Sequence, residues 1–183
     1  RDVLGSRGLG DVYKRQGSAL SLSQVDFKSS DIILDGTFNL GVCGIDSGGN
    51  GARLVFGIGG IMNVNQKIWG ASDFSVSGTL ATTSTDLAAG EFQFVTRTLI
   101  TSAGFDGGSI SLGDFTAEDG GALTKASGIM EGNAADYQGQ YYLYTEDGNV
   151  KVQYVVAGAV PEPATATLSL LGLASLMLRR RRA

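Results

Sequence analysis

The sequence has no histidine and one cysteine, Cys43. Histidine is the commonest general base and metal ligand near neutral pH, so its absence weakens the case for a hydrolytic or metal site. A single cysteine excludes an intramolecular disulfide. Cys43 lies between Val42 and Ile45 in a run flanked by glycine, which predicts a small buried side chain rather than an intermolecular or reactive thiol.

Proline is nearly absent: the chain has two, against 28 glycines in 183 residues. The glycines follow no three-residue period, which excludes a collagen-like helix and indicates turns between many short segments. Hydrophobic residues make up 43% of the chain, enough to exclude disorder by composition and to build the core of one domain.

Basic residues are scarce in the middle of the chain. Residues 17–160 hold six lysines and arginines against 15 aspartates and glutamates, a net charge near −9. Four of the remaining basic residues lie at positions 179–182 and four in the first sixteen positions. An acidic body repels phosphate backbones, so we expect no nucleic acid partner.

The N-terminus has neither an initiating methionine nor an apolar signal-peptide core. If the protein is exported, we therefore expect its natural start to lie upstream of Arg1. Residues 11–16 resemble linker-derived runs translated at the ends of unrelated metagenomic reading frames. We treat residues 1–16 as a non-native segment and residues 17–160 as the body.

Short apolar segments with a period of two run along the body, separated by Gly, Asp, Asn and Ser. Aromatic and β-branched residues are common in them, which is typical of strands joined by turns. They include residues 20–25, 32–34, 38–42, 54–56, 61–64, 74–80, 92–100 and 110–112. One weak helical stretch, residues 87–91, contains Gly90, which argues against a helix. The pattern predicts an all-β body.

The clearest local prediction is a hairpin. Two alternating segments, residues 141–145 and 150–156, flank the pair Asp147 and Gly148. Asp-Gly readily takes the positive φ angles of a tight hairpin turn. Alternation then places Val150, Val152, Tyr154 and Val156 on one face of the second strand.

Two all-β architectures remain open: a β-solenoid, and a two-sheet sandwich or jelly roll. The absence of a repeat of fixed length counts against a regular solenoid. The second half of the body nevertheless loosely resembles the closing segment of autotransporter-like β-helical passengers. The matching parts are residues 92–95, 104–108, 110–112 and 141–156. The resemblance implies a β-helix and favours the solenoid.

Several glycine-rich turns carry acids that suggest cation binding. Residues 46–51, 106–108 and 119–121 combine Asp with Gly, but none has the ordered spacing of a calcium loop, so we interpret them as solvated turns. Residues 57–60 form at best a fragment of a phosphate loop, without the Lys-Ser/Thr ending. We expect no metal and no cofactor.

Carboxylates and aromatic residues offer two weaker hypotheses. The pairs Glu118 with Asp119 and Asp26 with Asp31 are candidates for a glycosidase pair, although any acidic domain contains such pairs. Aromatic side chains that can stack on sugars are Trp69, Tyr137, Tyr141, Tyr142 and Tyr144. Such aromatics more often pack across strands, and we favour that interpretation.

The end of the chain has a separate organisation in three parts. Pro161, Glu162 and Pro163 come first, and an apolar run with six leucines comes next, over residues 164–178. The run ends in a basic cluster of Arg179, Arg180, Arg181 and Arg182. Both prolines of the chain therefore lie directly before the apolar run, and four arginines lie directly after it.

The apolar run predicts a marginal C-terminal transmembrane helix. Fifteen helical residues span about 22 Å, against a hydrocarbon core of about 30 Å. Six leucines favour insertion by about 3 kcal/mol in all, and the interspersed Thr, Ser and Gly reduce this. The arginines stay on the cytoplasmic side, which places the acidic body outside. The two prolines hold the chain extended, and their replacement by alanine would let a helix extend back toward Val155.

These three parts, in this order, resemble the PEP-CTERM sorting signal of Gram-negative bacteria. The resemblance implies recognition at Pro161, Glu162 and Pro163 by an exosortase, a membrane enzyme that processes such tails. It implies a helix over residues 164–178 and a membrane stop at residues 179–182. Residues 161–183 are thus the expected sorting tail, and residues 17–160 the expected extracellular domain.

We therefore expect an exported surface or extracellular-matrix structural protein that is not an enzyme. Its predicted location is the cell envelope, the cell surface or the extracellular space, with transient membrane anchoring by residues 164–178. The expected partners are an exosortase, the membrane and an extracellular polysaccharide. The alternative is a secreted carbohydrate-binding or carbohydrate-active β-protein, which rests on fold analogy alone.

Overall fold

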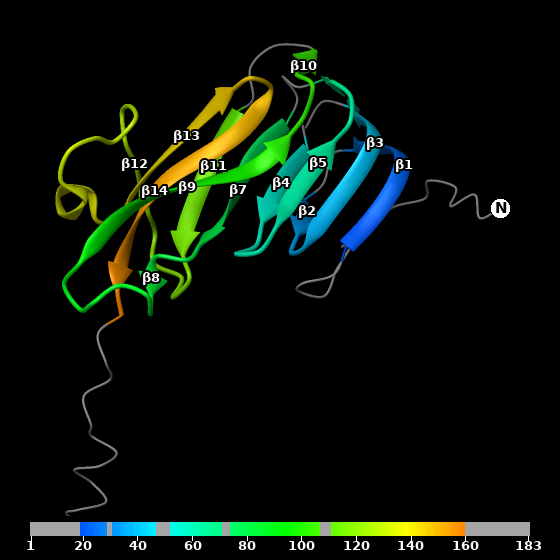
Figure 1. The fold of residues 1–183 in the computed structure, drawn as a ribbon. Helices are drawn as coiled ribbons and strands as arrows, with labels where there is room; N and C mark the ends of the chain where they lie inside the picture. The colour runs from blue at the N-terminus through cyan, green and yellow to red at the C-terminus, as the bar shows by residue number, and fades with distance from the viewer. Residues whose placement is uncertain (1–18, 29–30, 47–51, 71–73, 107–110, 160–183) are drawn as a thin grey trace, which may run out of the picture.

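The computed structural model describes residues 19–28, 31–46, 52–70, 74–106 and 111–159 (Figure 1). Strands form nearly all of the regular structure in these ranges, which also contain one short 3-10 helix, η2, Ala134–Tyr137. The predicted all-β class is confirmed. The helix predicted over residues 164–178 lies outside the described residues.

The described strands form two sheets (Figure 1). The smaller sheet contains β2 Asp31–Leu34, β4 Ala52–Phe56, β7 Phe74–Leu80 and β11 Ser111–Ala117. The larger sheet contains β1 Ala19–Lys28, β3 Thr37–Asp46, β5 Ile61–Val64, β6 Ile68–Trp69, β8 Thr83–Ser84, β9 Phe92–Thr101, β10 Phe105–Asp106, β12 Thr124–Lys125, β13 Gln140–Glu146 and β14 Asn149–Gly158.

Parallel pairing in chain order dominates both sheets. In the smaller sheet β2, β4, β7 and β11 follow one another as parallel neighbours. In the larger sheet β1 pairs with β3, β3 with β5, and β5 with β9, again all parallel. From β1 to β5 the chain thus alternates between the two sheets, and later the single strands β7 and β11 return to the smaller sheet.

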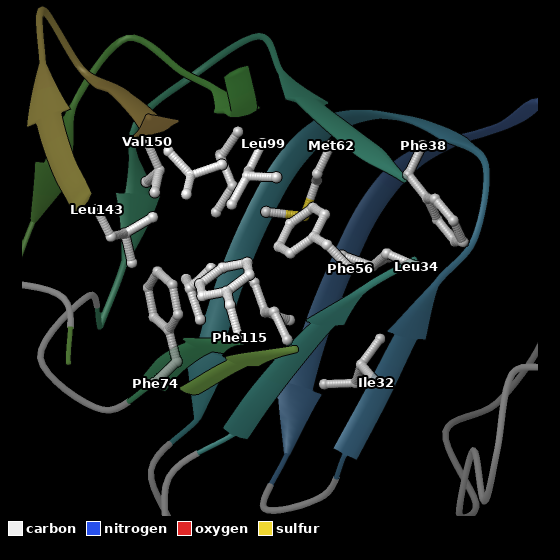
Figure 2. Close-up of a cluster of buried hydrophobic side chains, with 14 of the residues drawn as sticks. Ile32, Leu34, Phe38, Phe56, Met62, Phe74, Leu99, Phe115, Leu143 and Val150 are labelled. Carbon is white, nitrogen blue, oxygen red and sulfur yellow. The ribbon is translucent and has the colours of Figure 1, made fainter. Parts of the chain in front are cut away.

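Parallel register places like side chains above one another. Ile32 pairs with Leu54, and Leu54 pairs with Val76, and all three are buried. A second column in the larger sheet runs through Phe38, Met62, Ile100 and Val150, each at most 4% exposed. Figure 2 shows side chains of both sheets meeting in one apolar core. Burial of each large side chain stabilises the fold by about 1.5–3 kcal/mol relative to exposure.

Neighbouring strands of the smaller sheet approach closely enough at Gly78 to require glycine. Gly78 of β7 pairs with Phe56 of β4 and with Phe115 of β11. A Cβ atom at Gly78 would lie 2.2 Å from the Phe56 carbonyl oxygen. The three nearest atoms all belong to the Phe56 backbone, so a side chain at position 78 would require one of the paired strands to shift.

The series of parallel strands β1, β3, β5 and β9 is followed by an antiparallel hairpin, as the sequence predicted. β13 and β14 pair antiparallel, and β14 pairs antiparallel with β9. The two loop residues, Asp147 and Gly148, have φ angles of 48° and 77°, the left-handed values that this tight turn requires. Val150, Val152, Tyr154 and Val156 are buried, as the alternation predicted.

The opposite face of β14 is covered by the segment between β12 and β13. The Gln153 side chain accepts a hydrogen bond from the Met130 amide at 2.7 Å and donates one to the Met130 carbonyl at 3.0 Å. Phe94 of β9 packs against Tyr137 of η2 with ring centroids 5.8 Å apart. This cover explains why Gln153 is buried although it alternates with the core residues of its strand.

We predict that Gly78→Ala lowers the free energy of unfolding by about 1–3 kcal/mol, because the added methyl group displaces buried backbone. Gly59→Ala is the matched control, since a Cβ there meets nothing within 4 Å. The control should stay within about 0.5 kcal/mol of the parent chain in urea unfolding. Equal stability of the two variants would contradict the close approach at Gly78.

Candidate functional site

The last strand of the body ends beside β8, three positions before Pro161. β14 and β8 pair in parallel register. The Ala157 amide donates to the Thr82 carbonyl at 2.9 Å, and the Ala159 amide donates to the Ser84 carbonyl at 2.8 Å. Backbone hydrogen bonds therefore hold the chain as far as Ala159.

Gly158 is held from its other side as well. Its amide donates to the Glu91 carbonyl at 2.9 Å. A Cβ atom at Gly158 would lie 1.8 Å from the Ala88 carbonyl oxygen, so a side chain there requires the backbone to shift. The end of β14 is thus enclosed between β8 and the residues that precede β9.

Residues 85–91 form a turn, in agreement with the argument against a helix. The Asp86 amide donates to Ser84 Oγ at 3.1 Å, and the Ala88 amide donates to Glu91 Oε2 at 3.0 Å. Gly90 has a φ of 87°, which L side chains rarely adopt. Local side-chain hydrogen bonds of this kind favour turns over helices.

Glu118, directly after the end of β11, binds β8. Its Oε1 accepts a hydrogen bond from the Thr83 amide at 3.0 Å and another from the Thr83 hydroxyl. We call residues 83–91, Glu118 and residues 157–159 together the exit face, because the chain leaves the described body there. The sequence made Glu118 a candidate for a glycosidase pair, but its carboxylate already binds this strand.

Two of the other predicted acids, Asp119 and Asp31, also bind neighbouring groups. Asp119 Oδ1 accepts from the Gly121 amide at 2.8 Å, which confirms a turn at residues 119–121. Asp31 pairs with Arg53 on the adjacent strand, with Nε and Oδ1 2.9 Å apart. The hydrogen bond from Arg53 lowers the pKa of Asp31. Asp26 lies in β1 of the larger sheet, whereas Asp31 lies in β2 of the smaller one.

The predicted phosphate-loop fragment, residues 57–60, binds an arginine side chain of the body. Arg97 of β9 donates through Nη2 to the Gly57 carbonyl at 2.8 Å and to the Gly60 carbonyl. A phosphate cradle presents amide hydrogens to its ligand, whereas this turn presents carbonyl oxygens to the guanidinium. Burial lowers the pKa of Arg97. The turn therefore joins β4 and β5 to β9.

The candidate aromatic residues divide into packed and surface groups. Tyr141 is buried, packs against Phe115 at 5.1 Å, and donates from its hydroxyl to the Gly113 carbonyl at 3.1 Å. Burial raises the pKa of Tyr141. Tyr142 and Tyr144 are half-buried, and their rings stack at 5.8 Å with an interplanar angle of 15°.

Three further candidates lie in different surroundings. Tyr137 packs on Phe94, Trp69 is 54% exposed, and Cys43 is buried as predicted. The turn at residues 46–51 lies mostly outside the described residues, as do residues 107 and 108. Among the described residues, no three His, Cys, Asp or Glu side chains gather as metal ligands.

The predicted sorting residues come after the described chain. Pro161, Glu162, Pro163, Arg179, Arg180, Arg181 and Arg182 all lie outside the described residues. Within the part of the chain that the structure describes, no helix has the length and apolar character needed to cross a membrane. The structure therefore defines how the body ends, and the tail is defined by its sequence alone.

Comparison with known families identifies the tail. Residues 159–182 match a family model described as the PEP-CTERM protein-sorting motif. No curated protein and no solved structure matches the chain. The resemblance drawn from residues 161–182 is confirmed, whereas the resemblance to autotransporter passengers stays a prediction. The motif implies recognition by an exosortase and export to the cell envelope or surface.

We predict that Gly158→Ala opens the end of β14, because the new methyl group would overlap the Ala88 carbonyl. Hydrogen exchange at the Ala157 and Ala159 amides should accelerate by at least about tenfold, while exchange at Val152 stays unchanged. Gly128→Ala is the control, since a Cβ there meets nothing within 4 Å. Unchanged exchange at Ala157 and Ala159 would show that the exit face does not hold the strand.

Proposed function

We propose that this chain is an exported structural protein of the cell surface or extracellular matrix, without enzymatic activity of its own. Its tail delivers it and is then removed or exchanged. The observation that carries the proposal is the match of residues 159–182 to the sorting motif, with its three parts in order. Residues 17–160 are the extracellular domain in this account.

The three parts of the tail act together during sorting. The arginines at 179–182 keep the C-terminal end cytoplasmic, so the Pro-Glu-Pro motif faces outward. Pro161 and Pro163 hold Glu162 in an extended strand that an exosortase can bind. The enzyme breaks a peptide bond of the tail, and the acyl group passes to water in removal or to an amine acceptor in exchange. The tail fragment leaves with a new amino terminus.

The apolar run fits a transient anchor better than a permanent one. A helix over residues 164–178 would span about 22 Å, about 8 Å less than the hydrocarbon core. The Thr, Ser and Gly residues within it weaken insertion further. Such a segment holds the protein in the membrane long enough for processing. The final location of the protein is then determined by the enzyme.

For the body we propose a β-solenoid closed at one end by the hairpin of β13 and β14. Chain-order parallel pairing supports it, since parallel strands of a solenoid stack as successive rungs. A polar ladder supports it too: Asn63 Nδ2 donates to Asn39 Oδ1 at 2.9 Å, and the Thr101 hydroxyl donates to Asn63 Oδ1 at 2.7 Å. These three residues occupy successive strands at one register position.

The structural role is supported by how the body uses its polar groups. Glu118 binds β8, Asp119 closes a turn, and Asp31 bridges two adjacent strands through Arg53. Acids that are spread over turns and strand edges stabilise a scaffold. A glycosidase instead needs two carboxylates converging about 5–9 Å apart across one cleft.

A second candidate function is carbohydrate binding. Tyr142 and Tyr144 favour it, because their parallel, partly exposed rings on β13 offer a face on which sugar rings can stack. Lys151 pairs in register with Tyr144 and forms an ion pair with Glu146, which places hydrogen-bonding groups beside the rings. An extracellular polysaccharide is the ligand class that fits such a surface.

Binding to a polysaccharide panel tests this second function. If it holds, Tyr142→Ala combined with Tyr144→Ala should lower affinity at least about tenfold, since stacking contributes of the order of 1 kcal/mol per ring. Tyr137→Ala, which removes a ring packed on Phe94, is the control for a general effect on folding. If the parent chain shows no measurable binding, carbohydrate binding is rejected and only the structural role remains.

The sorting role predicts that Pro161→Ala combined with Pro163→Ala accumulates as an unprocessed, membrane-bound chain. Without the prolines, a helix can extend back through the motif and hide it. The sequence predicts that this helix extends back toward Val155. In the parent chain β14 and its hydrogen bonds hold the backbone as far as Ala159, so extension that leaves this strand paired stops at Val160.

The measurement is the fraction of processed chain in cells that contain the exosortase. Thr165→Ala combined with Thr167→Ala is the matched control, since it adds two alanines to the tail and keeps the motif. We expect normal processing of the control and little processing of the proline variant. Equal processing of both variants would mean that the Pro-Glu-Pro motif is not what the enzyme reads.

A further inference from the structure

The folded body and the sorting motif are joined almost without a linker. The Ala159 amide is still bonded to Ser84, and Pro161 is two positions further on. Two extended residues reach at most about 7 Å. An enzyme that binds Pro161, Glu162 and Pro163 must therefore approach the body to within the length of a few residues.

The distance to the membrane is short for the same reason. Ala164, where the apolar run begins, is five positions after Ala159, and this stretch spans at most about 18 Å when extended. The polar interface of one bilayer leaflet takes up about 5–8 Å of this span. The end of β14 thus stands close to the membrane whenever the apolar run is inserted.

From the short connection between Ala159 and the motif, we propose that the exit face contacts the membrane processing enzyme during sorting. The inference rests on the proposed sorting function and adds a contact surface to it. Residues 83–91, Glu118 and residues 157–159 would lie against the outer surface of the enzyme while it holds the motif. The enzyme then reads the tail from Val160 onward, since residues 157–159 remain paired with β8 and Glu91.

The opposite end of the body faces away from the membrane in this arrangement. The hairpin turn at Asp147 and the exit face lie at opposite ends of β14 (Figure 1). Ten residues of strand separate them, which corresponds to about 30 Å. A residue at the hairpin turn is therefore too far away to contact an enzyme that sits at the tail.

A protein partner fits the exit face better than the lipid surface does. Asp86, Glu91 and Glu118 are exposed there, and none of them forms an ion pair among the described residues. Anionic headgroups repel such a surface over about one Debye length, roughly 8 Å at physiological ionic strength. The observations therefore favour the enzyme as the occupant.

Photo-crosslinking of the full chain in cells with the exosortase tests the proposal. A photoreactive side chain replaces Asp86 on the exit face or, as the matched control, Asp147 at the hairpin turn. We expect an adduct between chain and enzyme from position 86, at least fivefold more abundant than from position 147. Comparable adducts from both positions, or an adduct with lipid in place of the enzyme, would overturn the proposal.

A spacer variant tests whether the contact at position 86 depends on the short connection between the body and the motif. Twelve Gly and Ser residues inserted between Ala159 and Val160 should keep the tail processed but lower the adduct at position 86 at least fivefold. An undiminished adduct would mean that the contact does not depend on the short connection, and would contradict the proposal. Loss of processing in the proline variant, together with no adduct at position 86, would reject this inference and leave the sorting function standing.

Discussion

The parallel register between successive strands is the constraint on which the rest of the structure depends. It stacks Ile32, Leu54 and Val76 in one column of the smaller sheet and Phe38 and Met62 in one column of the larger sheet, so that the apolar side chains of both sheets meet in one core. The paired strands lie so close together at Gly78 that a side chain there would overlap the backbone of Phe56. The same register aligns Asn39, Asn63 and Thr101 as a hydrogen-bonded ladder. A shift of one residue would exchange buried for exposed positions along the whole strand.

The antiparallel hairpin ends this stacking and also leads to the functional tail. β14 pairs with β9, the last strand of the parallel series β1, β3, β5 and β9, and then continues to Gly158, where β8 and Glu91 hold it. One strand therefore closes the core and determines where the sorting motif begins. The stability of the β13–β14 hairpin and the position of the sorting motif are linked through β14. Any change that frees the end of β14 also lengthens the flexible connection to Pro161.

Local signals in the sequence predicted the all-β class, the hairpin at Asp147 and Gly148, and the sorting tail, because each depends on residues adjacent in the chain. Strand partners were not predictable in this way. Paired positions are 18 residues apart for Ala19 and Thr37, 24 for Thr37 and Ile61, and 36 for Ser75 and Ser111, so no fixed repeat appears. The exit face was missed because most of its hydrogen bonds join residues that are distant in sequence. The partnership of Arg97 with the turn at residues 57–60 was hidden for the same reason.

The tail is, on this proposal, a signal to be processed, and the folded body is the product. Intact-mass measurement of the protein recovered from the cell surface tests this most directly. Processing predicts a mature chain that ends before Arg179, either free or joined to an acceptor through its new carboxyl end. A surface protein that still carries residues 179–183 would contradict the proposal, since the tail would then be a permanent anchor.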